Sequence, residues 1–285
     1  MDYPIVEVET IDRIPLYGLF LEAKNSKVVL INIHGTASNF YENDYMNPIT
    51  KSLLKNGISV LSTNNRGASV MQVYPHAGAA LERFEDCILD IDSWIKFVLS
   101  KGYKKIILQG HSLGSEKAVY YMSKGKYKDK IKTVILLGPA DSYGNTCKLL
   151  KNKKELLIEE AKKLVKTRNG EQFLNTVWLC HGNILPKGAA SFLNFFSDGS
   201  ELSKALPLRQ GEDLGLYRKI KVPILVVIGD KKEYTVISIK EALKLMRIEN
   251  KFAECYQIKN CNHDFEGREK ELTKIISNFL RKFKA

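Results

Sequence analysis

The stretch KKIILQGHSLGSEKAVYYM, residues 104–122, decides the fold. It opens with an apolar run of strand length at 106–108 and closes with apolar residues at helical spacing. Between the two stands GHSLG at 110–114, a GxSxG pattern. The stretch therefore predicts a strand that turns sharply into a helix, with a serine at the turn.

Ser112, at the centre of this pattern, is the candidate nucleophile. A sharp strand-to-helix turn lifts the serine Oγ above the sheet, and the flanking glycines remove side chains that would collide with neighbouring backbone. The N-terminus of the following helix also favours developing negative charge. The alternative is a structural serine that caps the helix. Its placement directly between a strand and a helix favours the nucleophile.

Strand-like runs recur on both sides of this turn. They are rich in β-branched residues and lie at 28–33, 58–61, 106–108, 134–137 and 224–228, with an alternating run at 252–258. Amphipathic helical patterns separate them. This alternation predicts an α/β fold with a mostly parallel, doubly wound sheet and helices on both faces. We expect an antiparallel hairpin at 6–9 and 16–22 to precede it.

The alternation of strand and helix breaks at residues 143–217. A lysine-rich helical stretch at 153–166 is followed there by an aromatic, glycine-containing segment. Because the region is too long for an ordinary loop, we expect an inserted helical cap in a core formed by 1–142 and 218–285. The cap is expected over the carboxyl edge of the sheet, where folds of this class bind ligands. Its aromatic residues either line a pocket or form its own core: Phe173, Trp178, Phe192, Phe195 and Phe196.

Two further stretches fit the chemistry of a nucleophilic serine. His263 lies on a loop after the 252–258 run and is last in the order nucleophile, acid, base, so it is the candidate general base. A neutral imidazole with a pKa near ~6.5 accepts the seryl proton and returns it to the leaving group. Upstream, HG at 34–35 ends a strand, and its histidine is expected to orient the loop. The backbone N–H groups of Thr36 and Leu113 are the expected oxyanion hole.

Together these motifs resemble the α/β-hydrolase superfamily of esterases, lipases and thioesterases. The resemblance rests on HG at 34–35, GHSLG at 110–114 and NHDF at 262–265, and it spans the core. It implies the α/β-hydrolase fold and a Ser–His–acid triad. A narrower resemblance, to small serine esterases related to fungal siderophore esterases, rests on three stretches: HGTASNFYEN from residue 34, NNRG from residue 64 and EYT from residue 233.

The acid of the triad departs from the pattern of the superfamily. Relatives carry Asp three residues after the glycine that ends the strand at 224–228, where this chain has Lys232. Glu233, one position later with a longer side chain, is one candidate, and Asp230 is a second. Asp141, on the loop after the preceding strand, is a third, since some members supply the acid from there. A lysine beside the imidazole would disfavour its charged form, so impaired catalysis is an alternative.

The candidate residues predict a serine hydrolase that cleaves a carboxylic ester. Ser112 forms an acyl-enzyme and His263 transfers the proton, while the two backbone N–H groups hold the oxyanion. A thioesterase or an amidase would use the same residues. A hydrolase-fold binding protein that has lost turnover is the alternative from another class, and it is motivated by Lys232.

The charge and hydropathy of the chain limit its partners. The 285 residues include 44 Lys and Arg against 32 Asp and Glu, a formal charge of +12. The basic residues are scattered, which favours a solvated surface over nucleic-acid binding. No apolar run approaches the ~20 residues of a membrane span, and no secretory signal is visible, so a cytoplasmic location is expected.

Cysteines and glycines give no sign of a cofactor. The five cysteines are odd in number and form no CxxC pair, which argues against a disulfide framework and a zinc site. No phosphate-binding glycine loop follows the early strands. We therefore expect no metal and no organic cofactor, and a small acyl molecule as the partner. The sequence carries no signal for an oligomeric state.

Overall fold

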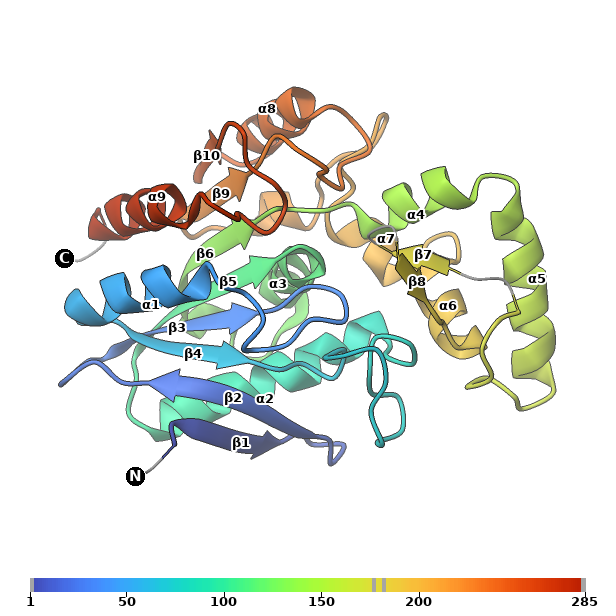
Figure 1. The fold of residues 1–285 in the computed structure, drawn as a ribbon, viewed down its shortest axis with the longest axis horizontal. Helices are drawn as coiled ribbons and strands as arrows, with labels where there is room; N and C mark the ends of the chain where they lie inside the picture. The colour runs from blue at the N-terminus through green and yellow to red at the C-terminus, as the bar shows by residue number, and fades with distance from the viewer. Residues whose placement is uncertain (1–2, 176–177, 181–182, 283–285) are drawn as a thin grey trace.

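Eight strands form the central sheet of the computed structural model, which describes residues 3–175, 178–180 and 183–282. Their order is β1-β2-β4-β3-β5-β6-β9-β10 (Figure 1). β1 (Ile5–Glu9) and β2 (Pro15–Leu21) form an antiparallel hairpin, and β2 also runs antiparallel to β4 (Ser59–Thr63). All other neighbouring strands of this sheet are parallel. The predicted α/β class, with its hairpin before a parallel sheet, is confirmed.

The inner strands are buried on both faces. The remaining strands of the sheet are β3 (Val28–Ile33), β5 (Lys105–His111), β6 (Ile131–Leu137), β9 (Ile224–Ile228) and β10 (Ala253–Gln257). In β9, Ile224 and Val226 join the core cluster on one face, while Leu225 and Val227 join the cluster on the other. Because successive side chains point to opposite faces, a strand covered on both sides becomes an unbroken apolar run.

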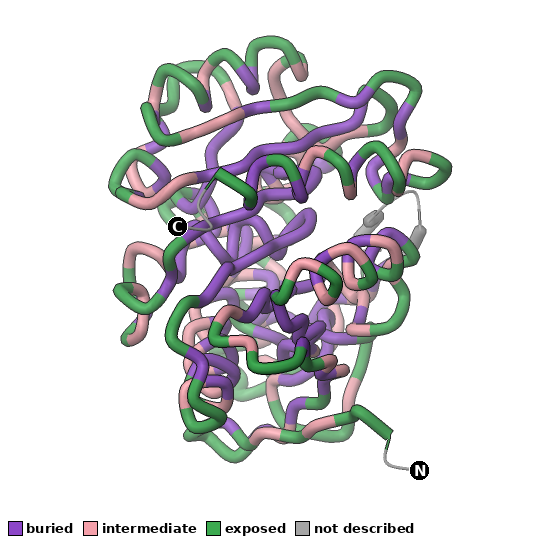
Figure 2. Tube along the Cα trace, turned by 90° about the vertical axis from the view of Figure 1, so that its left-hand side faces the viewer, coloured by how far each residue is buried: buried purple, intermediate pink, exposed green. Residues whose placement is uncertain are grey.

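Helices cover both faces of the sheet (Figure 1). α1 (Met46–Lys55) and α9 (Glu269–Arg281) pack on one face, each through one apolar stripe. α2 (Cys87–Ser100), α3 (Leu113–Lys124) and α8 (Ile239–Glu249) pack on the other. In Figure 2, buried residues run through the interior of the chain trace and exposed residues lie mostly around its outside. In the part of the chain that the structure describes, no helix is long and apolar enough to cross a membrane.

The chain between β6 and β9 forms a separate group of elements beside the sheet. It contains α4 (Ser142–Leu150), α5 (Lys153–Lys166), β7 (Trp178–Cys180), β8 (Asn183–Leu185), α6 (Ala189–Phe196) and α7 (Glu201–Ala205). These elements lie on the side toward which β3 and β4 point in Figure 1. The antiparallel pair β7–β8 was not predicted, because strands of three residues carry too little alternation to be recognised.

The interior of this inserted group is aromatic and continues into the core. Phe192, Phe195 and Phe196 are buried in one cluster with Leu113 and Tyr120 of α3. These three phenylalanines therefore form the core of the insert. Among the other predicted aromatics, Phe173 is partly buried, and the side chain of Trp178 lies outside the described residues.

Candidate active site

Ser112 occupies the turn between β5 and α3 in a strained conformation. Its φ of 54° and ψ of −125° lie in a region that non-glycine residues rarely adopt, and the residue is 5% exposed. A Cβ on Gly110 would lie 2.1 Å from the carbonyl oxygen of Gly114, and a Cβ on Gly114 would lie 2.3 Å from that of Ile33. The two glycines of the pattern are therefore required by close backbone contacts around the serine.

The loop that follows β3 lies against Ser112. A Cβ on Gly35 would lie 2.9 Å from the Ser112 Cβ, so the backbone here passes directly beside the candidate nucleophile. Thr36 follows at this turn, and Leu113 is the first residue of α3. Among the described residues, no protein acceptor takes a hydrogen bond from the N–H of Thr36 or Leu113. Two backbone donors are thus present at the end of β3 and the start of α3.

His34 links this loop to the next one. Its Nδ1–H donates to the carbonyl oxygen of Gly35 at 2.7 Å, and its Nε2 accepts the N–H of Asn65 at 3.1 Å. Burial, with a smaller contribution from the positive charge of Lys117, lowers the pKa of His34 to about 3. The ring is therefore neutral, as the two hydrogen bonds require. Lys117 Nζ in turn donates to Asn65 Oδ1 at 2.9 Å and to Glu82 at 2.7 Å.

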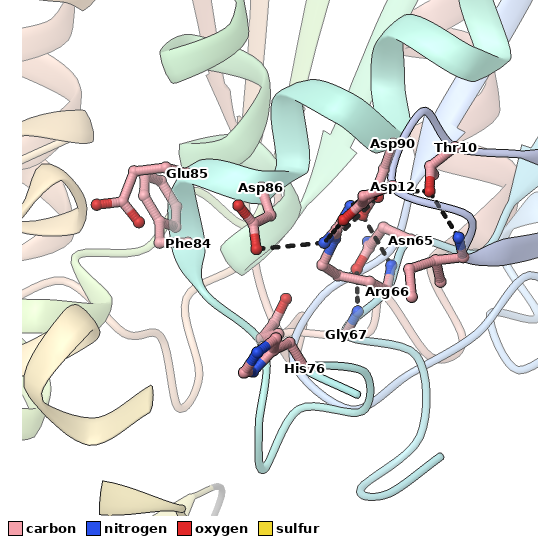
Figure 3. Close-up of polar contacts among 12 residues, drawn as sticks. Thr10, Asp12, Asn65, Arg66, Gly67, His76, Phe84, Glu85, Asp86 and Asp90 are labelled. Atoms are coloured by element: carbon pink, nitrogen blue, oxygen red, sulfur yellow. Dashed lines mark hydrogen bonds and ion pairs between the residues drawn. The ribbon is translucent and has the colours of Figure 1, made fainter. Parts of the chain in front are cut away.

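The NNRG stretch after β4 is a structural junction. Arg66 is 1% exposed and forms ion pairs with Asp12 at 2.8 Å, Asp86 at 3.2 Å and Asp90 at 2.9 Å (Figure 3). These carboxylates come from the β1–β2 hairpin and from the start of α2. These ion pairs hold Arg66, the residue after Asn65, in place. Since the N–H of Asn65 donates to His34, they also stabilise the loop that contacts His34.

His263 is paired with Glu233. The His263 Nδ1–H donates to Glu233 Oε2 at 2.8 Å, and the two side chains are 5% and 1% exposed. The other carboxylate oxygen accepts the N–H of Gly229 at 2.9 Å. Since Nδ1 carries the proton in this bond, Nε2 is the nitrogen of the neutral ring that accepts a proton. Lys232 has a left-handed φ of 52°, and its side chain is exposed. The chain turns at this residue, and the side chain of the next one, Glu233, contacts the imidazole.

Asp230, the second candidate acid, has a different role from Glu233. Its two carboxylate oxygens accept the N–H groups of Asn260 at 2.9 Å and Cys261 at 3.0 Å, and these bonds lower its pKa. Asp230 therefore holds the loop that precedes His263.

Asp141, the third candidate, is the N-cap residue of α4. It accepts the N–H of Gly144 at 2.7 Å and is paired with Arg209 at 2.8 Å, at the start of α4. Burial raises its pKa and Arg209 opposes that shift. Of the three carboxylates, the structure brings only Glu233 into hydrogen-bond contact with His263.

The His263 ring lies beside the Ser112 turn. The Ser112 N–H donates to the carbonyl oxygen of Leu137 at 3.0 Å. The next residue, Gly138, has a φ of 49°, and a Cβ on it would lie 2.9 Å from His263 Cε1. Tyr234 contacts the ring edge to face, with centroids 4.7 Å apart. Sequence reasoning missed Gly138 and Tyr234; the glycine that directly follows the 134–137 run was a usable signal for the first.

The donor set of the described residues does not suggest a metal centre. No three His, Cys, Asp or Glu side chains in residues 3–175, 178–180 and 183–282 group closely enough to hold an ion. The carboxylates near the site are engaged with the imidazole, with backbone N–H groups and with Arg209.

The strand order, the strained serine turn and the helices on both faces define an α/β-hydrolase fold. The model of the family described as serine aminopeptidase S33 matches residues 24–185, more than half of the chain. The chain belongs to this family and is a hydrolase of the α/β-hydrolase superfamily. The resemblance to that superfamily is confirmed, whereas the comparisons do not test the narrower one to siderophore esterases.

Solved structures share this fold across the whole chain. An esterase from Pyrococcus furiosus is 20% identical, with a TM-score of 0.62 over 99% of this chain and 91% of its own. Est1E from Butyrivibrio proteoclasticus is 16% identical, with a TM-score of 0.64 over 98% of both chains. A monoglyceride lipase from Saccharomyces cerevisiae is 14% identical, with a TM-score of 0.70 over 99% and 96%. No curated protein matches the sequence.

Proposed function

We propose that this protein is a serine carboxylesterase in which Ser112, His263 and Glu233 act as a catalytic triad. One observation carries the proposal: a buried imidazole–carboxylate pair stands beside a serine in a strained strand-to-helix turn. A carboxylate on Nδ1 fixes the tautomer whose Nε2 faces the reaction and stabilises the imidazolium that forms. Two observations support an active triad over the impaired hydrolase that Lys232 suggested: Glu233 supplies a carboxylate to His263, and the lysine side chain is exposed.

The proposed reaction proceeds through an acyl-enzyme. Ser112 Oγ attacks the ester carbonyl carbon while His263 Nε2 takes its proton, and the N–H groups of Thr36 and Leu113 hold the resulting oxyanion. Collapse of the tetrahedral intermediate breaks the bond to the alcohol, which leaves with the proton from His263. Water then attacks the acyl group by the same route, with the acid released and the proton returned to Ser112.

Residues 143–217 act in this proposal as a cap that shapes the acyl pocket. The support is the shared apolar cluster, in which Leu113, next to the nucleophile, packs with Phe192, Phe195 and Phe196 of the insert. An acyl pocket lined by such apolar side chains would favour an apolar acyl group.

An ester is the preferred substrate class in this proposal, and an amide is the second candidate. The similar structures include an esterase and a monoglyceride lipase, whereas the family description is that of an aminopeptidase. Both reactions, like that of a thioester, use the same nucleophile, base and oxyanion donors.

The proposal is tested with p-nitrophenyl acetate, butyrate and octanoate, and in parallel with leucine p-nitroanilide. We expect turnover of at least one ester by the wild type and its loss in Ser112→Ala by roughly 10⁴-fold or more. Hydrolysis of the anilide but of no ester would move the assignment to the amidase. Turnover of neither substrate class, or turnover that survives in Ser112→Ala, would overturn the proposal.

A further inference from the structure

His111, the residue before the nucleophile, contacts the candidate base directly. It is 3% exposed at the end of β5, and its Nε2 lies 2.9 Å from the carbonyl oxygen of His263. A carbonyl oxygen only accepts hydrogen bonds, so the His111 Nε2 carries a proton and donates it. This bond links the strand that carries the nucleophile to the main chain of the base.

The two imidazole rings also pack against each other. The ring centroids of His111 and His263 are 4.7 Å apart with an interplanar angle of 40°. Around His111, the rings of Tyr45 and Phe265 lie at 5.3 Å and 6.2 Å. The His263 ring is thereby bounded by His111 and by the edge contact from Tyr234.

Other contacts hold the His263 loop at atoms different from the carbonyl oxygen that His111 contacts. Asp230 holds the main chain at Asn260 and Cys261, three and two residues before the base. Glu233 holds the ring of His263 by accepting a hydrogen bond from its Nδ1–H. A hydrogen bond fixes the distance along its axis but not the rotation of the ring about that axis. The hydrogen bond from His111 to the carbonyl oxygen of His263 adds a restraint on the main chain of the base itself.

We propose that His111 is a positioning residue that sets the place and rotation of the His263 imidazole. The inference rests on the proposed function, since it assigns His111 a part in the same reaction. The GxSxG pattern leaves this position open, so the turn alone does not demand a histidine. Misplacement of a catalytic group by about 1 Å costs on the order of 10²-fold in rate, which makes such an anchor valuable.

Two variants separate the hydrogen bond from the packing. His111→Gln places an amide N–H near the position of the imidazole Nε2, whereas His111→Met fills a similar volume without that donor. With the best p-nitrophenyl ester, we expect His111→Met to lose roughly 10- to 100-fold in kcat with KM little changed, because the base is displaced and the acyl pocket is not. We expect His111→Gln to stay within about threefold of the wild type.

A spectroscopic readout makes the test independent of turnover. The deshielded proton resonance of His263 Nδ1–H, assigned by its loss in Glu233→Gln, is expected to persist in His111→Gln and to broaden or disappear in His111→Met. Thermal unfolding confirms that each variant is folded. Equal losses in both folded variants, or an unchanged resonance and kcat in His111→Met, would overturn the inference.

The outcomes keep this inference separate from the proposed function. If the wild type hydrolyses no substrate, the function fails, while the resonance still tests whether His111 positions the ring. If the wild type hydrolyses an ester and Ser112→Ala does not, the function stands whatever the His111 variants do.

Discussion

The turn that carries Ser112 and the turn that carries Glu233 both hold one side chain in place, but by different backbone contacts. Both place a side chain of the proposed triad by means of a non-glycine residue with positive φ, Ser112 at 54° and Lys232 at 52°. At the Ser112 turn, backbone atoms of the flanking Gly110 and Gly114 contact neighbouring backbone so closely that neither position has room for a Cβ. At the Glu233 turn, the residue with positive φ has an exposed side chain.

This difference explains why one turn follows a pattern and the other does not. Backbone contacts around Ser112 cannot relax, so the residue spacing of the turn is fixed. At Glu233, an exposed left-handed residue adds one position to the loop, and the longer glutamate side chain still reaches His263. The first turn therefore tolerates little change, and the second tolerates a change of length if the carboxylate arrives at Nδ1.

Gly110→Ala is expected to have the largest effect, since the added Cβ would clash with the backbone of the Ser112 turn. Its Cβ would meet the Gly114 carbonyl oxygen at 2.1 Å, and no side chain there can move aside. We expect destabilisation of about 3 kcal/mol or more and no measurable ester hydrolysis. Thermal unfolding and p-nitrophenyl ester assays measure both. Gly215→Ala is the control, because its nearest neighbour is the movable carboxylate of Asp213 at 3.2 Å. A soluble Gly110→Ala protein with wild-type turnover would contradict the account of this turn.

Glu233→Gln tests the adaptable turn. Loss of the carboxylate removes the partner that stabilises the His263 imidazolium, so we expect kcat to fall by roughly 10³- to 10⁴-fold with the fold preserved. Asp230→Asn is the matched control, because the Asp230 carboxylate accepts the backbone N–H groups of Asn260 and Cys261 on the His263 loop rather than the N–H of the imidazole. Its kcat is expected to fall less than about tenfold. The reverse ranking, measured under saturating ester, would exclude Glu233 as the acid.

The buried His34, which hydrogen-bonds the loop beside Ser112, predicts an effect of pH on the stability of the fold. The pKa of His34 is lowered to about 3 in the fold, against an ordinary value of 6.5. The unfolded chain therefore binds this proton first, and stability falls as pH drops from 6.5 toward 3, by up to about 1.4 kcal/mol per pH unit.

We expect His34→Gln to be less stable than the wild type at pH 7 but to lose less melting temperature between pH 6.5 and 4.5. The same change at His76, whose side chain is 43% exposed, is the control. Parallel curves for the wild type and His34→Gln would show that His34 does not cause the acid sensitivity.

Lys232→Gly is expected to have the smallest effect. Glycine adopts the left-handed conformation without strain, which offsets its greater freedom in the unfolded chain, so stability should change by less than about 1 kcal/mol. Turnover should stay within about twofold, because the lysine side chain is exposed and Glu233 keeps its place. A large fall in kcat would mean that Lys232 itself contributes to the site.

The core and the serine turn were readable from sequence because local pattern and packing agree there. Apolar runs such as 224–228 are strands buried on both faces, and the glycines of GHSLG match the contacts found around Ser112. The sequence alone left the acid open among Glu233, Asp230 and Asp141, since the choice depends on the left-handed turn at Lys232 and on which side chain contacts His263. The roles of Asp230 and Asp141 likewise depend on partners distant in sequence, Cys261 and Arg209.

The most direct test of the proposed triad is the rate at which a p-nitrophenyl alkylphosphonate labels Ser112. Intact-mass and peptide mass spectrometry would follow the wild type, Glu233→Gln and Asp230→Asn. We predict one adduct per chain, on Ser112, formed roughly 10³-fold more slowly in Glu233→Gln and at a near wild-type rate in Asp230→Asn. No adduct in the wild type, an adduct on another residue, or equal rates in wild type and Glu233→Gln would contradict a triad of Ser112, His263 and Glu233.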